Sequence, residues 1–302
     1  KTYGRALELR PGQLYCILQR GALQYELGEL HEAMASYNAA LGLDRTHPAA
    51  LLGAAEVALA KAHGHAALGA IAAAAAELRA AAALAASAAR QHGGLEAAWK
   101  LLGDILLHAS ALPLQAKQQQ QQQDAADGAA ASHAAAAAAG DADPPAARAV
   151  QAALAAGHVR LGAAKHACRA YARALHLAPT RAGLWGDLAE ASRQCVVLQQ
   201  QHQSGPPSVD HPGSPASTPA HIPLSPAEAQ ALLALSKRLL QGGLRLDPCS
   251  DWLWGRLGAV ATTASSVAAA AAPGGDGEAA AAEAEYCYCR ALQLNPKRAE
   301  LW

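Results

Sequence analysis

The side chains that could carry metal or redox chemistry are few in this sequence and do not converge on a ligand set. Cys287 and Cys289 stand two residues apart, and on a helix that spacing turns them about 200° away from each other, so they cannot share one tetrahedral ion. We expect both to be buried as small apolar residues. His63 and His65 are also two apart, with no Cys or acidic residue close by in the sequence. We therefore predict no metal site and no cofactor.

Catalytic motifs are missing as well. The sequence has no nucleophile elbow, no glycine-rich phosphate loop and no zinc-hydrolase helix, and we expect Gly93-Gly94 and Gly242-Gly243 at helix ends. We predict no catalytic and no cofactor-binding residue, and hence no enzyme. The sequence assigns no partner-binding residue either.

Three Ser-Pro or Thr-Pro pairs could accept phosphate. They are Ser214-Pro215, Thr218-Pro219 and Ser225-Pro226. Ser225 is equally typical of a helix N-cap that is followed by proline at the first helical position.

Composition favours helices and excludes several classes of protein. Alanine dominates the apolar residues and Phe is absent, so strand formers are sparse. The 24 basic and 24 acidic side chains cancel, which gives no general attraction to nucleic acid or to anionic lipid.

Six scattered cysteines do not form a secreted disulfide framework, so we expect a reducing compartment. No apolar run is expected to span a bilayer. Because the chain opens at Lys1 without methionine, we expect an internal fragment of a longer protein.

The stretch Leu14–Arg45 contains the spacing that organises the rest of the chain. As a 34-residue helix-turn-helix, it puts the small residues Gly21 and Ala33 where two antiparallel helices approach closely, and the bulky Tyr37 in the gap between them. Gly28 is predicted in the left-handed conformation at the turn. This spacing is that of a tetratricopeptide repeat. Because one such hairpin cannot cover its own apolar face, we predict an array.

Later repeats keep the spacing but have longer connections. Repeats are predicted to start near Leu14, Pro48, Glu96, Ala182, Asp251 and Ala299. Where the interval between two successive repeat starts exceeds 34 residues, the additional residues fall between the two helices of one repeat. We treat 1–302 as one array with disordered inserts at 113–146 and 199–224 and a short insert at 266–278. In the second repeat, 62–75 is predicted to lengthen the hairpin before the second helix settles at about 76–91. The predicted fold is an all-α, right-handed tetratricopeptide-repeat solenoid with disordered low-complexity insertions.

Two patterns support this register. All fifteen predicted close-contact sites hold small residues: Gly21, Ala33, Ala40, Ala55, Ala81, Ala88, Gly103, Ala167, Ala174, Ala189, Ser236, Gly243, Gly258, Ala284 and Ala291. Four of the five tryptophans fall at one repeat position: Trp99, Trp185, Trp254 and Trp302. An abundance of alanine cannot produce the tryptophan pattern. A closing proline recurs likewise at Pro11, Pro179, Pro248 and Pro296.

The tryptophans and the first helices were each compared with a known mode of binding. The tryptophans could stack single-stranded nucleic acid, but their shared repeat position favours packing between paired helices. Co-chaperones of the repeat class that bind a C-terminal carboxylate resemble one another in an Asn at the sixth position of successive first helices. Here those positions hold Gln19, Gly53, Leu101, Asp187 and Arg256, which disfavours that function.

Four stretches together resemble one particular repeat protein in their order and irregular spacing. They are 95–112, 170–195, 232–261 and 284–302, and they include Trp-Lys-Leu-x-Gly-Asp at 99–104 and the Trp-Gly-Asp-Leu start at 185–188. This succession resembles the middle of the tetratricopeptide-repeat scaffold subunit of the superkiller (Ski) complex. The Gln-rich and Pro/Ser-rich inserts depart from that family.

The resemblance implies a non-catalytic cytoplasmic scaffold, possible also in the nucleus, that supports 3′-to-5′ mRNA decay and RNA surveillance. Its implied partners are an RNA helicase and WD-repeat subunits, and indirectly the exosome. Neither direct nucleic-acid binding nor membrane association is expected. Two alternatives remain open, namely the repeat domain of a larger enzyme such as a glycosyltransferase, and a peptide-binding adaptor.

Overall fold

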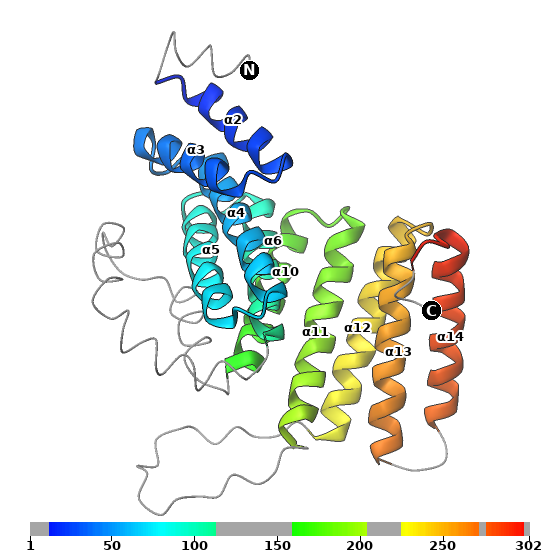
Figure 1. Cartoon of the computed structure of the whole chain (residues 1–302). Coiled ribbons are helices and arrows are strands. Elements are labelled where there is room, and N and C mark those ends of the chain that lie inside the picture. Colours follow the sequence, from blue (N-terminus) through cyan, green and yellow to red (C-terminus); the bar gives the residue numbers. More distant parts are fainter. Residues whose placement is uncertain (1–11, 113–158, 204–224, 272–275, 299–302) are drawn as a thin grey trace, which may run out of the picture. The chain divides into compact units, whose positions relative to one another are not determined.

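A computed structural model describes residues 12–112, 159–203, 225–271 and 276–298 (Figure 1). These residues form ten α helices and no strand, which confirms the all-α prediction. The helices are α2 (Leu14–Glu26), α3 (Leu30–Leu43), α4 (Pro48–Ala67), α5 (Ile71–Gln91), α6 (Glu96–Ala111), α10 (Val159–Leu177), α11 (Ala182–Gln203), α12 (Pro226–Leu246), α13 (Asp251–Ala271) and α14 (Asp276–Leu294).

The helices pack in five pairs. α2 packs with α3, α4 with α5, α6 with α10, α11 with α12, and α13 with α14. The first helix of each pair begins at the residue where the sequence starts a repeat, from Leu14 to Asp251. The sixth predicted start, at 299, lies outside the described residues, as do 113–146 and 204–224 of the two long inserts.

Contacts divide the chain into two compact units, where the sequence predicted one array. The N-terminal unit is 1–177 and the C-terminal unit is 178–302. Inside each unit, the second helix of a pair packs on the first helix of the next: α3 on α4 and α5 on α6, and likewise α12 on α13. The first helices also touch, since α2 contacts α4, α4 contacts α6, and α11 contacts α13. The repeats therefore stack within each unit.

The small residues and the tryptophans occupy the predicted settings. All fifteen predicted close-contact residues are buried. Each of three tryptophans donates its indole N–H to the backbone carbonyl six residues earlier, in the connection that precedes the first helix. The pairs are Trp99 to Gly93 at 3.1 Å, Trp185 to Pro179 at 2.9 Å and Trp254 to Pro248 at 3.0 Å. Trp185 also lies against Gly242 of the paired helix α12. Trp254 is likewise in edge contact with Tyr286 of its paired helix α14. Packing between paired helices is thereby confirmed for Trp185 and Trp254.

The second repeat is longer than the first because both of its helices are longer. α2 and α3 have 13 and 14 residues, and α4 and α5 have 20 and 21. Seven residues make about two helical turns, so the added length keeps each apolar face pointing inward. The turn is the same in both repeats, with Gly28 at φ 79° and Gly69 at φ 75°. The hairpin is lengthened over 62–75 as predicted, but by continuous helix, and the prediction that the second helix settles only at about 76 was wrong because α5 begins at Ile71.

Two other predicted boundaries were also wrong. α11 continues to Gln203, so 199–203 is helical and not part of a disordered insert. Gln199 is buried, and glutamine is a good helix former, so packing and propensity both extend this helix. In the fifth repeat, α13 runs to Ala271 and α14 begins at Asp276, so most of the short insert at 266–278 is helical. Alanine-rich segments have high helix propensity, and this explains the extension.

One helix of the described residues, α5, is long and apolar enough to cross a membrane, contrary to the expectation from sequence. Its composition has another explanation. Leu78 and eight alanines of α5 are buried, and the helix packs against both α4 and α6. A buried core helix is expected to be this apolar.

Candidate functional site

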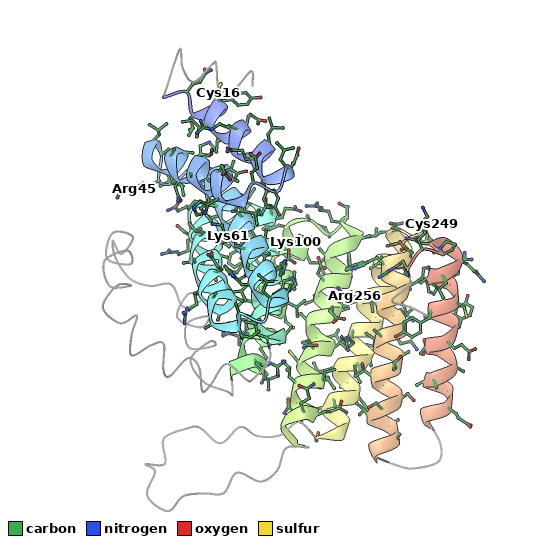
Figure 2. All side chains as sticks on the ribbon, viewed as in Figure 1. Cys16, Arg45, Lys61, Lys100, Cys249 and Arg256 are labelled. Carbon is green, nitrogen blue, oxygen red and sulfur yellow. The ribbon has the colours of Figure 1, made fainter. Side chains whose placement is uncertain are left out.

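The first helices of successive repeats form a surface in each unit, which we call the first-helix surface. In the N-terminal unit it is formed by α2, α4 and α6, and in the C-terminal unit by α11 and α13. Figure 2 shows side chains of both surfaces, among them Lys100 on α6 and Arg256 on α13. Because several helices contribute to each surface, residues far apart in the sequence meet there.

Tyr37 of α3 is wedged between the first helices of two repeats. A Cβ atom added to Gly53 of α4 would lie 2.3 Å from Cζ of the Tyr37 ring, and one added to Gly21 of α2 would lie 3.1 Å from it. Only glycine leaves room for the ring at Gly53. The ring itself is buried. Tyr37 therefore joins α2, α3 and α4 at one point of the core.

Two other tyrosines repeat this contact and extend their hydroxyl groups to side chains of the first helices. A Cβ at Gly103 would lie 2.6 Å from the ring of Tyr171, whose hydroxyl donates to Oδ1 of Asp104 at 2.7 Å. Tyr288 lies against Gly258 in the same way, and its hydroxyl is 3.3 Å from Oγ1 of Thr262. The close-contact glycines thus position polar groups on the first-helix surface.

Two carboxylates of the N-terminal unit have different surroundings. Asp104 accepts from Tyr171 and forms an ion pair with Lys100, whose Nζ lies 2.8 Å from Oδ2. Glu56 of α4 has no ion pair or hydrogen bond to any described residue. Its side chain is exposed, yet enough protein surrounds it to raise its pKa by desolvation, with the negative charge of Asp104 as the second cause and Lys100 opposing them. Glu56 is therefore an exposed carboxylate that lacks a cation of its own among the described residues.

Two tyrosines lie close to Glu56. The pKa values of Tyr25 and Tyr37 are raised, first by burial and then by the negative charge of Glu56. Tyr25 is half-buried and packs against the cluster that includes Tyr37 and Val57. Three oxygen-bearing side chains from α2, α3 and α4 therefore lie within electrostatic range of one another.

A pair of histidines also meets on this surface. The rings of His63 on α4 and His108 on α6 are in edge contact, with centroids 4.2 Å apart. The pKa of His108 is lowered, mainly by desolvation and then by His63, while Asp104 opposes the change. In the sequence, His63 was noticed as a possible metal ligand only together with His65, two residues away. The contact with His108 comes from stacking of two repeats, which the spacing within one helix does not reveal.

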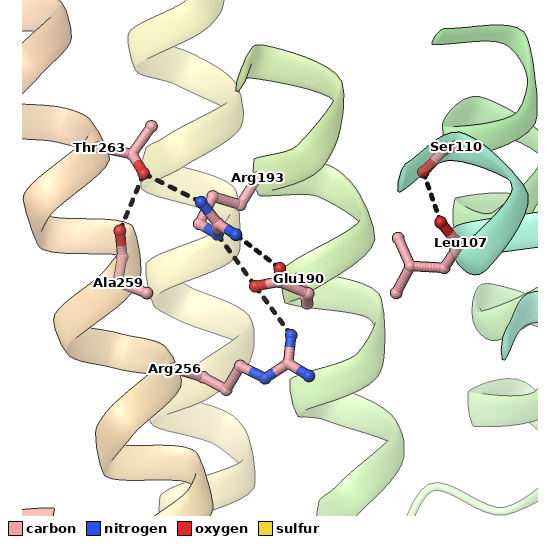
Figure 3. Close-up of polar contacts among 7 residues, drawn as sticks. All are labelled: Leu107, Ser110, Glu190, Arg193, Arg256, Ala259 and Thr263. Carbon is pink, nitrogen blue, oxygen red and sulfur yellow. Dashed lines mark hydrogen bonds and ion pairs between the residues drawn. The ribbon is translucent and has the colours of Figure 1, made fainter. Parts of the chain in front are cut away.

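An ion network joins the two first helices of the C-terminal unit (Figure 3). Arg193 of α11 donates through Nε and Nη2 to the two carboxylate oxygens of Glu190, at 2.9 and 2.6 Å, and its Nη1 lies 3.4 Å from Oγ1 of Thr263 on α13. Arg256 of α13 adds a second cation to Glu190 at 2.8 Å. Burial alone would raise the pKa of Glu190, but the two arginines outweigh it and lower the pKa.

An aromatic contact holds Arg256 in place. Its guanidinium carbon lies 4.9 Å from the centre of the Trp252 ring, which packs over Gly186 of α11. Among the described residues, Glu190 is the one acceptor that Arg256 contacts. Arg193 already pairs with both oxygens of Glu190, so this network carries one surplus positive charge.

Cys287 and Cys289, two residues apart in α14, lie in different surroundings. Cys287 is buried, and desolvation raises its pKa to about 11, so its thiol stays protonated. Cys289 is exposed, and the prediction that both would be buried was wrong for it. Their helical spacing turns them to different sides, as the geometry required. Cys249 is also exposed and lies between α12 and α13 (Figure 2). No three His, Cys, Asp or Glu side chains of the described residues form a metal-binding group.

The sixth positions of the first helices offer little to a peptide carboxylate. Gly53 and Leu101 are buried in the core, and Arg256 is paired with Glu190. No partner-binding residue was predicted from the sequence, and neither Glu56 nor the Glu190 network was recognised there. The Glu190 to Arg193 spacing was a visible signal of an ion pair within one helix. The contact with Arg256 could be found only from the packing of α11 on α13.

Stacked helix pairs with small contact residues, wedged tyrosines and repeated indole bonds give the chain an all-α fold of the tetratricopeptide-repeat type. No known family profile matches the sequence, and no curated protein sequence matches it. Among solved structures, the chain is similar to YrrB, a TPR protein with an unusual peptide-binding site, with 14% identity, a TM-score of 0.46, and coverage of 100% of this chain and 95% of that one.

Two further solved structures show a comparable likeness. A thermophilic TPR protein of Thermus thermophilus, TTC0263, has 14% identity and a TM-score of 0.46 over 95% of this chain and 94% of its own. MamA has 10% identity and a TM-score of 0.44, with coverage of 95% and 94%. Likenesses at this level of identity concern the fold and no particular function.

Proposed function

We propose that this chain is a non-catalytic scaffold that binds proteins through its first-helix surfaces. The observation that carries this proposal is that charged and aromatic side chains from successive repeats converge on these surfaces and reach solvent. The clearest examples are Arg256, which is stacked on Trp252, and Glu56, which pairs with no described residue. Glu56 pairs with no described residue, and the network of Arg256, Arg193 and Glu190 keeps one net positive charge, so each place can attract an opposite charge of a partner.

We further propose that the scaffold belongs to the superkiller complex and acts in the cytoplasm in 3′-to-5′ mRNA decay and RNA surveillance. Support comes from the resemblance of the stretches 95–112, 170–195, 232–261 and 284–302 to that complex's repeat subunit. The proposed partners are its RNA helicase and WD-repeat subunits, and the exosome indirectly. The three tryptophans that take part in this resemblance share one structural setting, as a genuine repeat register requires.

Reconstitution from purified components tests this assignment. The 302-residue chain is mixed with the recombinant helicase and WD-repeat subunits and passed over a size-exclusion column. We expect at least one subunit to co-elute. Elution of every subunit apart from the chain would overturn the superkiller assignment, and sugar-transfer activity of a longer form would favour the enzyme alternative.

A pair of matched variants tests whether the first-helix surface is used. Arg256→Gln removes the surplus positive charge of the C-terminal unit, and Arg245→Gln removes an exposed charge from the second helix α12. If a partner binds this surface, the first substitution weakens co-elution and the second does not. Equal effects would place the partner elsewhere.

A further inference from the structure

We propose that Glu56, together with Tyr25 and Tyr37, binds a lysine side chain from a basic segment of a partner protein. This inference rests on the proposed scaffold function and deepens it, because it names the chemistry recognised by the N-terminal unit. The three residues come from α4, α2 and α3, so the site exists only where two repeats stack.

Glu56 is available to a ligand because no described residue neutralises it. The neighbouring carboxylate, Asp104, already has a cation and a hydroxyl donor on its two oxygens, Lys100 at 2.8 Å and Tyr171 at 2.7 Å. Glu56 has no such partner in the part of the chain that the structure describes. Lys100 attracts it at longer range, yet the Nζ of Lys100 is held by Asp104. Of these two carboxylates, Glu56 is therefore the one that still lacks a counterion among the described residues.

The contact between Tyr37 and Gly53 sets the geometry of the proposed site. A Cβ at Gly53 would lie 2.8 Å from the Tyr37 hydroxyl oxygen, and Glu56 follows Gly53 by three residues, about one helical turn. The end of the Tyr37 ring thus lies one turn from the carboxylate on the same side of α4. Tyr25 packs against the cluster that contains Tyr37 and Val57, the residue that follows Glu56, so both rings lie beside this part of α4. The negative charge of Glu56 also contributes to the raised pKa of each tyrosine.

A lysine ammonium fits these groups chemically. It carries three N–H donors, and the site offers a carboxylate and two phenol oxygens as acceptors. The half-buried ring of Tyr25 can also attract a cation through its face. Desolvation and the negative charge of Asp104 raise the pKa of Glu56, and the positive charge of a bound lysine would oppose that change.

Fluorescence anisotropy with the intact 302-residue chain tests the proposal. The probe is a labelled peptide of about 12 residues in which lysine alternates with glycine or serine, and its comparison is the same peptide with acetylated lysines, which has the same backbone without the positive charges. We expect the lysine peptide to bind at low salt and acetylation to weaken binding on the order of tenfold or more, as for loss of a charge-assisted hydrogen bond.

Two glutamine variants separate this site from general electrostatics. Glu56→Gln removes the proposed carboxylate, and Glu32→Gln removes an exposed carboxylate from the second helix α3 of the same unit. We expect about tenfold weaker binding for the first and unchanged binding for the second. Tyr25→Phe, which removes one hydroxyl, should weaken binding by about threefold. Helical circular dichroism verifies that each variant is folded.

Equal weakening by Glu56→Gln and Glu32→Gln, or equal affinity for the plain and acetylated peptides, would overturn the site. Such a result would leave the scaffold proposal standing, because reconstitution with the helicase and WD-repeat subunits tests that separately. Loss of co-elution with normal peptide binding would instead overturn the superkiller assignment alone.

Discussion

Replacing Gly53 by alanine should destabilise the N-terminal unit although alanine is the better helix former. Gly→Ala in a helix interior normally stabilises by about 1 kcal/mol. At Gly53, however, the new Cβ would lie 2.3 Å from Cζ of Tyr37, more than about 1 Å inside ordinary carbon contact distance. The buried Tyr37 ring cannot swing out, because Gly21 confines its other side. Overpacking of this kind costs about 1–3 kcal/mol, and this severe contact belongs at the upper end. The expected net loss is about 2 kcal/mol.

Gly64 provides a matched control in the same helix. A Cβ there meets nothing within 4 Å, so Gly64→Ala should stabilise by about 1 kcal/mol. The two variants should then differ by about 3 kcal/mol in the free energy of unfolding. At roughly 2–4 °C per kcal/mol for a domain of this size, their melting temperatures should differ by about 6–12 °C.

Urea titration and thermal melting followed by far-ultraviolet circular dichroism measure this difference. In a Tyr37→Leu background the clash disappears, and Gly53→Ala should no longer destabilise. If Gly53→Ala proved as stable as Gly64→Ala in the otherwise unchanged chain, Tyr37 would not be wedged between α2 and α4, and the proposed lysine site would lose its geometric basis.

Three further predictions concern single interactions. Trp185→Phe removes the indole N–H that donates to Pro179 and should lower the free energy of unfolding by about 1 kcal/mol, measured by urea titration against the parent chain. The pKa of Glu190 is lowered in the folded state, so its stabilising contribution is complete above the ordinary pKa of 4.5 and is lost as the pH falls through the lower pKa of the folded state. Melting temperatures measured from about pH 7 to about pH 3 should show this loss. Glu190→Gln should remove this part of the pH dependence. Ser225→Ala breaks the capping box at the start of α12 and should cost about 1 kcal/mol, visible as faster amide exchange in the first turn of that helix, while an unchanged exchange rate would show that the cap contributes nothing.

Local signals in the sequence were sufficient for much of the fold. Pro48 stands at the first position of its helix, and Ser225 with Pro226 forms a cap and a first residue, so the starts of α4 and α12 could be predicted. The tryptophan and small-residue spacing located the first and second helices of five repeats. Helix ends next to inserts could not be predicted, because alanine- and glutamine-rich segments continue a helix for as long as a neighbour covers them. Gln199 in α11 is an example.

The candidate site was beyond the reach of sequence analysis for a different reason. Tyr37 was predicted as a packing residue of the first repeat, but Tyr25 and Glu56 were given no role, because nothing in the spacing within one helix links the three residues. The same holds for Arg256 with Glu190 and for His108 with His63, since each pair joins first helices of neighbouring repeats.

The sequence by itself determined that this chain forms helix pairs, where most of those pairs begin and which small residues lie between them, because these properties depend on spacing within about 34 residues. Only the tertiary structure decided that added length in the second repeat extends both helices and that Tyr37 is held between two glycines of different repeats. It also decided that Asp104 has a counterion while Glu56 has none among the described residues. These outcomes depend on how one repeat packs against the next. Stacking brings together side chains from separate helices, and their electrostatic surroundings arise only from that contact.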